Sequence, residues 1–206
     1  MSETNNATPI DWNIVILGAW NVAILTPSGI ASKLFGLEPG TPIEILVDTE
    51  GRAPIRVKFD DIIIEPSPVR LAITPQTPNF ESLGRCIAIA QKALSILPET
   101  PFSAIGLNLR FKLDVIPDAV IEVGESVIDN KLSDEGYILQ DKELNRTIEW
   151  KDGVLNLNIQ ENKDSSALIG LNYHKNSSSP TELSDWLNYH QEMNDAAEKI
   201  MGILIN

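Results

Sequence analysis

The sequence predicts an α+β fold in which an antiparallel sheet is covered by helices on one face and open on the other. Several segments alternate apolar and polar residues, which is typical of strands with one buried and one open face. Two longer segments repeat apolar residues at three- and four-residue spacing, which indicates amphipathic helices. Because each helical stripe has to be buried against another layer, these patterns together predict a layered α+β domain.

The first half of the chain predicts a long strand, a short helix, a four-stranded meander and a long helix. The long strand covers 13–25, which is rich in β-branched and aromatic residues. A short helix over 30–35 should end at Gly36. The meander strands, separated by turn residues, are predicted at 43–48, 55–59, 61–65 and 69–74.

A helix over 78–97 completes this half. Thr77 is placed to cap it. Pro78 stands at the first helical position, where the N–H that proline lacks would have no partner within the helix. Pro98 should stop it. Its apolar stripe consists of Phe80, Leu83, Ile87, Ala90, Leu94 and Leu97.

The second half predicts the same order of elements. A long strand over 102–115 is followed by a short helix or turn at 118–123. Four strands are then predicted at 136–140, 144–150, 154–160 and 167–174, and Asp152-Gly153 is a strong hairpin signal between the middle two. The last helix covers 180–204, where Ser179 and Glu182 have the spacing of a capping box.

We therefore predict one domain, 11–206, built as a structural duplication of the halves 11–97 and 101–205, and preceded by a flexible tail, 1–10. The segments Ile105-Gly-Leu-Asn108 and Ile169-Gly-Leu-Asn172 are identical, although they fall at different places in the proposed repeat. The order of elements is similar to that of the TATA-box-binding-protein fold, which implies one curved sheet with helices on its convex side. This is an analogy of topology, and topology does not determine function.

A short segment also resembles a group of uncharacterised bacterial proteins of similar size. The resemblance is in Leu97-Pro98-Glu99-Thr100-Pro101, in Ala104-Ile-Gly-Leu-Asn108, and in Phe111. It covers about fifteen residues, and it implies neither an activity nor site residues.

Composition limits the classes of partner. The formal net charge is −13, so phosphate backbones and anionic lipids are repelled unless the cations cluster. No apolar run approaches the length of a membrane span, and no basic, apolar leader begins the chain. The single cysteine, Cys86, excludes an internal disulfide, which favours a reducing, cytoplasmic location.

The sequence contains none of the common catalytic or cofactor-binding motifs that we searched for, among them phosphate-binding, dinucleotide-binding, zinc-protease and serine-hydrolase signatures. Two distant histidines and one cysteine do not have zinc-ligand spacing. The acidic pairs Asp60-Asp61 and Asp134-Glu135 fit solvated turns better than a ligand site. We therefore expect no enzymatic activity, no metal and no cofactor.

The open face of the predicted sheet is the candidate site. Along 104–113 the odd positions are apolar and Asn108, Arg110 and Lys112 face the other way, while 154–160 alternates in the same manner to expose Asn156 and Asn158. On an acidic molecule this face would present amides and cations. The predicted binding residues are Arg56, Lys58, Arg70, Asn108, Arg110, Lys112, Asn172 and His174. The alternative interpretation is that these are ordinary solvated positions.

Two functions follow. The first is a non-enzymatic protein-interaction subunit of a bacterial complex, with a homodimer as one form of it. The alternative is a ligand- or nucleic-acid-binding module that uses the polar face of the sheet, although the small number of aromatic residues on that face disfavours base stacking. Binding to a protein partner or to a second copy is expected before nucleic acid, and no membrane partner is expected.

Overall fold

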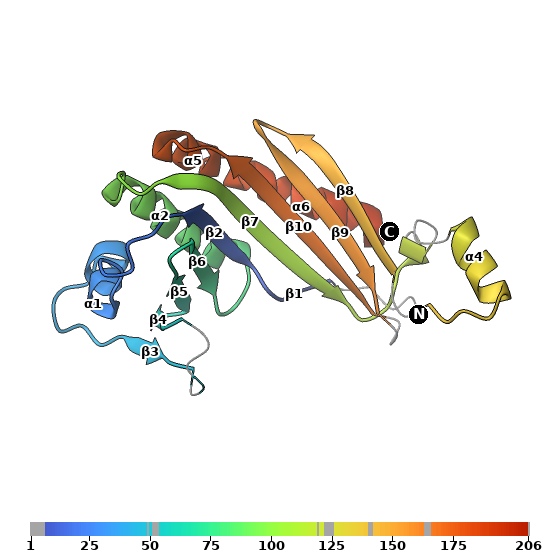
Figure 1. The fold of residues 1–206 in the computed structure, drawn as a ribbon, viewed down its shortest axis with the longest axis horizontal. Coiled ribbons are helices and arrows are strands. Elements are labelled where there is room, and N and C mark those ends of the chain that lie inside the picture. The colour runs from blue at the N-terminus through green and yellow to red at the C-terminus, as the bar shows by residue number, and fades with distance from the viewer. Residues whose placement is uncertain are drawn as a thin grey trace.

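The computed structural model describes residues 7–48, 50, 54–118, 120–121, 126–139, 142–162 and 166–205. Over these residues the chain is an α+β protein with one large antiparallel sheet, as the sequence predicts (Figure 1). The strand order is β3-β4-β5-β6-β2-β7-β10-β9-β8. The centre of the sheet is therefore the pair β2 and β7, each flanked by the last strand of a meander, β6 or β10.

The strands of the first half overlap the predicted ranges. They are β2 (Asn13–Gly18), β3 (Glu44–Leu46), β4 (Arg56–Phe59), β5 (Ile62–Pro66) and β6 (Arg70–Pro75). The alternation of the sequence is reproduced, since Val57, Ile64 and Ile73 are buried on one side while Arg56 and Lys58 face the other.

The first strand is shorter than predicted, because β2 ends at Gly18 instead of residue 25. The register with β7 shifts between Leu17 and Gly18, where a side chain at residue 18 would lie 2.9 Å from the carbonyl oxygen of Pro101. The chain then leaves the ladder, and residues 22–26 form turns and bends. β-propensity alone did not reveal this end because the following residues remain apolar.

The second half contributes β7 (Phe102–Leu113), β8 (Lys142–Trp150), β9 (Gly153–Glu161) and β10 (Ala167–Asn176). Of the predicted N-terminal tail, residues 1–6 lie outside the described residues. Thr8 and Pro9 form a short strand, β1 (Thr8–Pro9), that pairs with Lys112 and Phe111 of β7.

The strand predicted at 136–140 is wrong over its described part. Residues 137–139 have no regular structure, and Gly136 has a left-handed φ of 85°, a conformation that ends the preceding helix. That helix, α4 (Val127–Asp134), was not predicted; its N-cap is Ser126, whose side chain accepts the N–H of Asp129. Of the short helix or turn predicted at 118–123, residues 119, 122 and 123 lie outside the described residues.

The helices of the first half are α1 (Pro27–Gly29), the π-helix η1 (Ile30–Phe35) and α2 (Phe80–Ile96). The predicted stop at Gly36 is confirmed, with a left-handed φ of 76°. The predicted cap at Thr77 is wrong, because Asn79 caps α2. The Asn79 side chain accepts the N–H of Ser82, and the Ser82 hydroxyl accepts the N–H of Asn79, so this reciprocal pair sets the helix start.

The helix predicted over 180–204 is interrupted. It consists of α5 (Pro180–Leu187) and α6 (His190–Ile205). Asn188 lies at the break, where its side-chain oxygen accepts a hydrogen bond from Gln91 of α2. The predicted cap at Ser179 is confirmed by its bond from the Glu182 N–H, but the Glu182 carboxylate accepts the Ser177 hydroxyl instead of closing a capping box.

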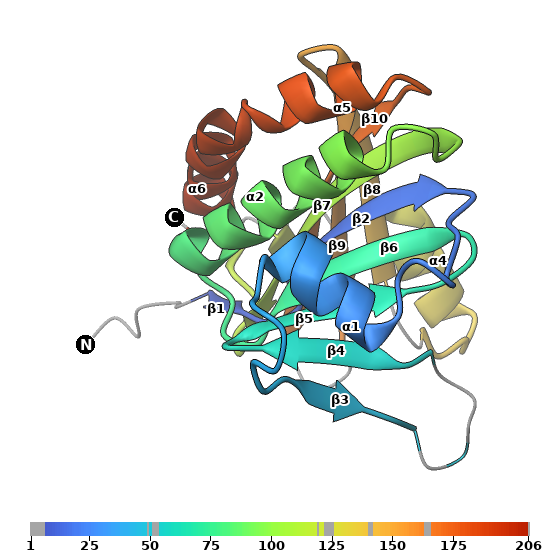
Figure 2. The same cartoon turned by 90° about the vertical axis from the view of Figure 1, so that its left-hand side faces the viewer.

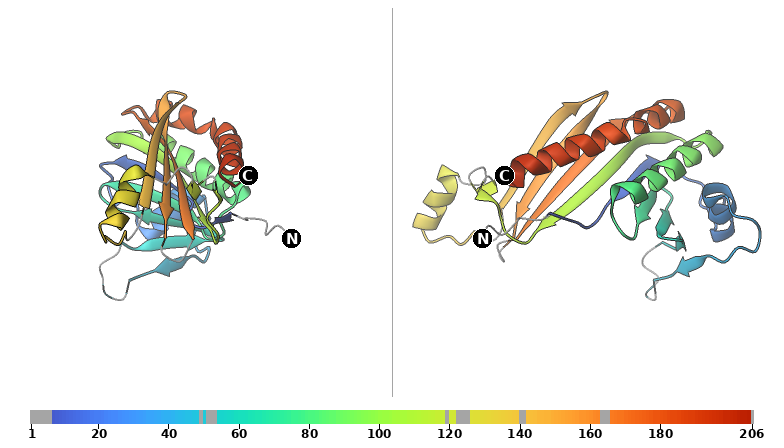
Figure 3. Two further views of the ribbon diagram at one scale, coloured as in Figure 1. Left: turned by 90° about the vertical axis from the view of Figure 1, so that its right-hand side faces the viewer. Right: turned by 180° about the vertical axis from the view of Figure 1, so that it is seen from behind.

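The core lies between the sheet and these helices. α2 packs on β2 and β6, α5 packs on β7 and β10, and α2 contacts both α5 and α6. Figures 2 and 3 show these helices beside the sheet, with α2 and α6 in front of it in the view from behind. Ile14, Leu107 and Tyr173 supply buried side chains from three central strands. Among the described residues, no helix is long and apolar enough to cross a membrane.

Candidate functional site

A line of polar side chains crosses five adjacent strands on the face opposite this core. Its members, which we call the asparagine row, are Asn13, Asn108, Asn172, Asn156 and Thr147, from β2, β7, β10, β9 and β8. Strand register places each member directly opposite the next. The row therefore runs perpendicular to the strands.

The asparagine row is one chain of hydrogen bonds that all point the same way. The Thr147 hydroxyl donates to Oδ1 of Asn156 at 3.0 Å, and Nδ2 of Asn156 donates to Oδ1 of Asn172 at 3.1 Å. Nδ2 of Asn172 then donates to Asn108 at 2.6 Å, and Nδ2 of Asn108 donates to Asn13 at 2.7 Å. Such a head-to-tail chain is cooperative, because each bond polarises the next.

The asparagine row leaves part of its hydrogen-bonding capacity unused. A carboxamide has two N–H donors and an oxygen with two lone pairs. In the hydrogen bonds among described residues, Asn108, Asn172 and Asn156 each use one donor and accept one bond. Within the described part of the chain, each of these three side chains therefore has one N–H and one lone pair that take part in no hydrogen bond.

The asparagine row borders a groove of about 580 Å³ on the open face, which we call the amide groove. It extends to both sides of the row, because strand register places Arg110 and Gly170 on one side of it and Val15 and Arg70 on the other. The complete lining is Asp11, Asn13, Val15, Arg70, Thr74, Asn108, Leu109, Arg110, Asn156, Asn158, Gly170, Leu171 and Asn172.

Gly170 lines the amide groove and has no side chain that would fill it. It pairs with Arg110 on one side and Asn158 on the other, so it lies in the line of residues next to the asparagine row. A Cβ atom at residue 170 would meet Asn158 Cβ at 3.7 Å, which is an ordinary contact. Packing in the fold therefore does not require glycine here, and a larger side chain would occupy the groove.

Most cations of the open face are already paired with carboxylates. Lys58 contacts Glu44 at 2.9 Å and Arg70 contacts Glu65 at 2.9 Å. The groove cation Arg110 lies 3.5 Å from Asp11, and Lys112 lies 3.0 Å from Asp114. The amides predicted for this face are present, but the cations predicted beside them are paired with carboxylates.

The structure places the eight predicted binding residues at different points of this face. Arg70, Asn108, Arg110 and Asn172 line the amide groove. Arg56 and Lys58 lie on β4, three strands from the asparagine row's nearest member, and Lys112 lies opposite Leu168. His174 lies opposite Gly106 and bonds the side chain of Asn176 at 2.9 Å. These last four do not line the groove.

Asn13, Asn156 and Thr147 belong to the asparagine row but were not selected from the sequence. Asn156 does stand on the predicted polar side of its strand, so alternation could have found it. Asn13 begins a strand that is otherwise apolar, and Thr147 follows no clear alternation. Only the pairing of the strands reveals that they belong with Asn108.

The buried groups with raised pKa values lie on the helix side of the sheet. Burial, with a smaller effect of Asp61, raises the pKa of the Cys86 thiol to about 12, so the thiol is protonated at neutral pH. Burial also raises the pKa of Tyr173, whose hydroxyl donates to the Met193 carbonyl oxygen at 2.8 Å. No group of three potential metal ligands occurs among the described residues.

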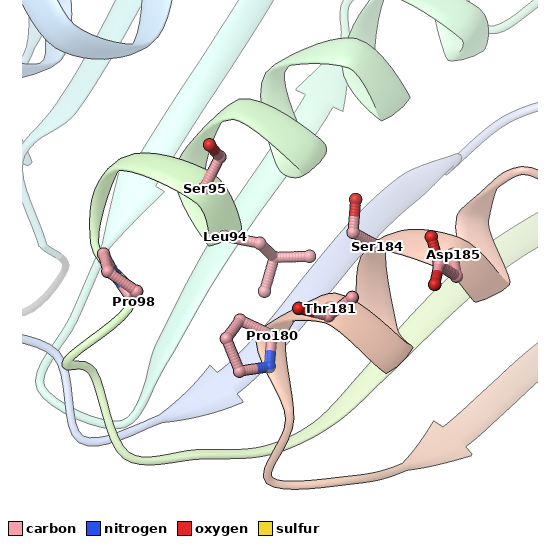
Figure 4. Close-up of a pocket in the computed structure, with 7 residues that line it drawn as sticks. All are labelled: Leu94, Ser95, Pro98, Pro180, Thr181, Ser184 and Asp185. Atoms are coloured by element: carbon pink, nitrogen blue, oxygen red, sulfur yellow. The ribbon is translucent and has the colours of Figure 1, made fainter.

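Two other hollows lie near α5. Figure 4 shows one of about 330 Å³ between the end of α2 and the start of α5, with Leu94, Pro180 and Ser184 among its walls. Another, of about 420 Å³, lies beside Trp186 and Tyr189. Neither contains a connected set of polar groups like the asparagine row, so the amide groove is the stronger candidate.

We compared the chain with protein-family models, with curated proteins and with solved structures, and none of the three comparisons gave a match. The resemblance around residues 97–111 and the analogy to the TATA-box-binding-protein fold therefore stay predictions.

Proposed function

We propose that this chain is a non-enzymatic interaction subunit that binds a polypeptide partner on the open face of its sheet, in the amide groove. The observation on which this rests is the unused hydrogen-bonding capacity of the asparagine row, held in fixed positions by neighbouring strands. Side chains held in this way lose little conformational freedom when a partner binds, which favours binding.

The groove chemistry supports a polypeptide over a nucleic acid. Phosphate binding is favoured when protein cations displace the counterions condensed on the nucleic acid, but Arg70 and Arg110 already face carboxylates. The groove lining contains no aromatic side chain on which a base could stack. The same two observations weaken the alternative of a nucleic-acid-binding module.

The groove chemistry also supports binding without catalysis. Acid–base or nucleophilic catalysis requires a titratable group or an activated nucleophile beside the reacting atom. Five of the thirteen lining residues carry carboxamides, which do not titrate, and the one acid of the lining, Asp11, lies beside Arg110. The Thr74 hydroxyl has no histidine among the lining residues to activate it.

The proposal includes the internal duplication of 11–97 and 101–205, with the main helices on one face. Its support is the strand order. In the first half β2 pairs with the last strand, β6, and in the second half β7 pairs with the last strand, β10. The two first strands, β2 and β7, also pair with each other. One free, buried cysteine supports action in a reducing cytoplasm. A homodimer and a larger bacterial complex are both compatible with a polypeptide partner.

A photo-crosslinking experiment tests the proposal. A photoreactive amino acid replaces Thr74 in the groove wall, and in a control it replaces Glu198, an exposed residue of α6. After irradiation of living cells, residue 74 should give an adduct that protease degrades and nuclease does not, and residue 198 should not give it. A nuclease-sensitive adduct, or the same protein adduct from both positions, would contradict the proposal. An adduct with a second copy would identify a homodimer.

A further inference from the structure

We infer that the amide groove recognises the main chain of an extended polypeptide segment, with little dependence on side chains. This inference rests on the proposed function, because it assumes a polypeptide partner. It adds the chemical class of the contact, and it predicts tolerance to the partner's sequence.

Hydrogen-bonding complementarity is the first argument. In an extended chain each residue presents its own N–H donor and C=O acceptor on the same side of the chain. Asn108, Asn172 and Asn156 each have one N–H and one lone pair unused among the described residues, which is the matching set. A carboxylate would supply acceptors only and an ammonium donors only, so neither ion could satisfy both groups of one carboxamide.

The length of the asparagine row is the second argument. Its five members lie on five adjacent strands, and four inter-strand spacings of about 4.8 Å give roughly 19 Å. An extended chain advances about 3.3 Å per residue, so about six residues would cover the row. The N–H and C=O groups on one side of an extended chain come from every second residue, so about three residues can present both groups to the row.

The third argument is the lack of an anchor for side chains. Binding sites that select side chains usually hold an aromatic or aliphatic anchor in a desolvated pocket. The amide groove has a floor at Gly170, Val15 is its one apolar residue not buried in the core, and its lining has no aromatic ring. Main-chain hydrogen bonds would therefore supply the affinity, as they do when a peptide is added to a sheet edge.

A purely internal role is the competing explanation. Cross-strand asparagine pairs can fix strand register without binding anything. The groove beside the row and its unused donors are not needed for that role. The two explanations predict different effects of Gly170→Leu on peptide binding. This variant fills the groove and removes none of the hydrogen bonds of the asparagine row.

The test uses the full chain, immobilised, and a mixture of random-sequence decapeptides as the probe. A second mixture has ester linkages in place of all its peptide bonds, which removes the N–H donors from both sides of the extended chain with little change of shape. Each mixture is passed over the wild type, Gly170→Leu and the control Gly84→Leu. The control makes the same change on α2, where an added Cβ would meet nothing within 4 Å. Circular dichroism and thermal melting verify that each variant is folded.

The wild type and Gly84→Leu should retain peptides with diverse side chains. Retention should fall at least tenfold for the ester mixture and for Gly170→Leu. Equal retention of the ester mixture would overturn main-chain recognition and leave the proposed function standing. Undiminished retention by folded Gly170→Leu would overturn both proposals. If the wild type retains neither mixture, the inference is wrong, while the crosslinking result decides the proposed function independently.

Discussion

Asn108 and Asn172 face each other across β7 and β10, and Nδ2 of Asn172 donates a 2.6 Å hydrogen bond to Oδ1 of Asn108. Each is the last residue of an Ile-Gly-Leu-Asn segment. Because the strands are antiparallel, the two identical segments extend in opposite directions from this pair. The register of β7 and β10 therefore brings two carboxamides together on the open face, in the middle part of the asparagine row.

Asn108→Ala should break the asparagine row at this point. The change leaves the oxygen of Asn13 and an N–H of Asn172 without their partners in a half-buried site, so we expect a loss of about 1–2 kcal/mol in unfolding free energy. Urea denaturation measures this loss. Asn130→Ala, at an exposed position of α4, is the control and should change stability by less than about 0.5 kcal/mol. Equal effects of both variants would contradict a structural contribution from the row.

Replacement by alanine should destabilise the fold at one of two glycines in paired strands and have little effect at the other. A Cβ at residue 153 would lie 2.3 Å from the His174 carbonyl oxygen, so Gly153→Ala should cost about 2–3 kcal/mol through backbone displacement. At residue 170 the closest contact would be an ordinary 3.7 Å, so Gly170→Ala should stay within about 0.5 kcal/mol of the wild type. Thermal melting of both variants measures this difference, and a destabilised Gly170→Ala would mean that the groove floor is more tightly packed than the contacts indicate.

Trp186→Ala should be among the most destabilising single changes. The side chain is 2% exposed and its ring lies 6.1 Å from that of Trp150, so removing it leaves a cavity that costs about 3–5 kcal/mol. Its indole N–H has no partner among the described residues, so Trp186→Phe should cost much less, because no hydrogen bond is lost. Chemical denaturation compares the two. A loss below about 1 kcal/mol for Trp186→Ala would show that the residue is not part of the core in solution.

Binding in the amide groove should depend weakly on salt. Proteins that bind phosphates through many cations lose affinity by about 10³–10⁵ between about 50 and 200 mM salt. Arg70 and Arg110 are already paired with acids, and neutral carboxamides release no counterions, so we expect a change in Kd of less than about threefold. Titration of the protein with the partner identified by crosslinking, at both salt concentrations, measures this change in Kd. A steep decrease would favour the nucleic-acid alternative.

Cys86 should make the fold sensitive to alkaline pH. In the unfolded chain a thiol has a pKa near 8.5, but in the folded protein burial raises the pKa of Cys86 to about 12. The resulting stabilisation is complete below about pH 8.5 and is lost as the pH rises towards 12, because only the unfolded state ionises in that interval. Between pH 7 and 10 the wild type should therefore lose about 2 kcal/mol more than Cys86→Ala. Urea midpoints at both pH values test this, and equal losses would show that the thiol is accessible in the folded protein.

The sequence by itself determined which side of each strand meets the core. Along β7, alternation assigned Leu107 and Leu109 to the buried face and Asn108 to the open one, and the burial of the two leucines agrees. This works because side chains on a strand alternate strictly between faces. The prediction of strands failed where the alternation of apolar and polar residues was weaker. Residues 136–140 contain enough apolar and aromatic side chains to suggest a strand, but α4 and the left-handed Gly136 precede irregular backbone at residues 137–139.

Only the tertiary structure decided which polar side chains meet. Asn108 bonds Asn13, 95 positions earlier, and Asn172, 64 positions later. Periodicity within one segment contains no information on which strands become neighbours, since that depends on how the whole sheet packs against the helices. The same holds for charge, because Arg110 is neutralised by Asp11 from a different part of the chain. The sequence could therefore predict a polar face, while the connected carboxamides and the neutral groove beside them depend on long-range strand pairing.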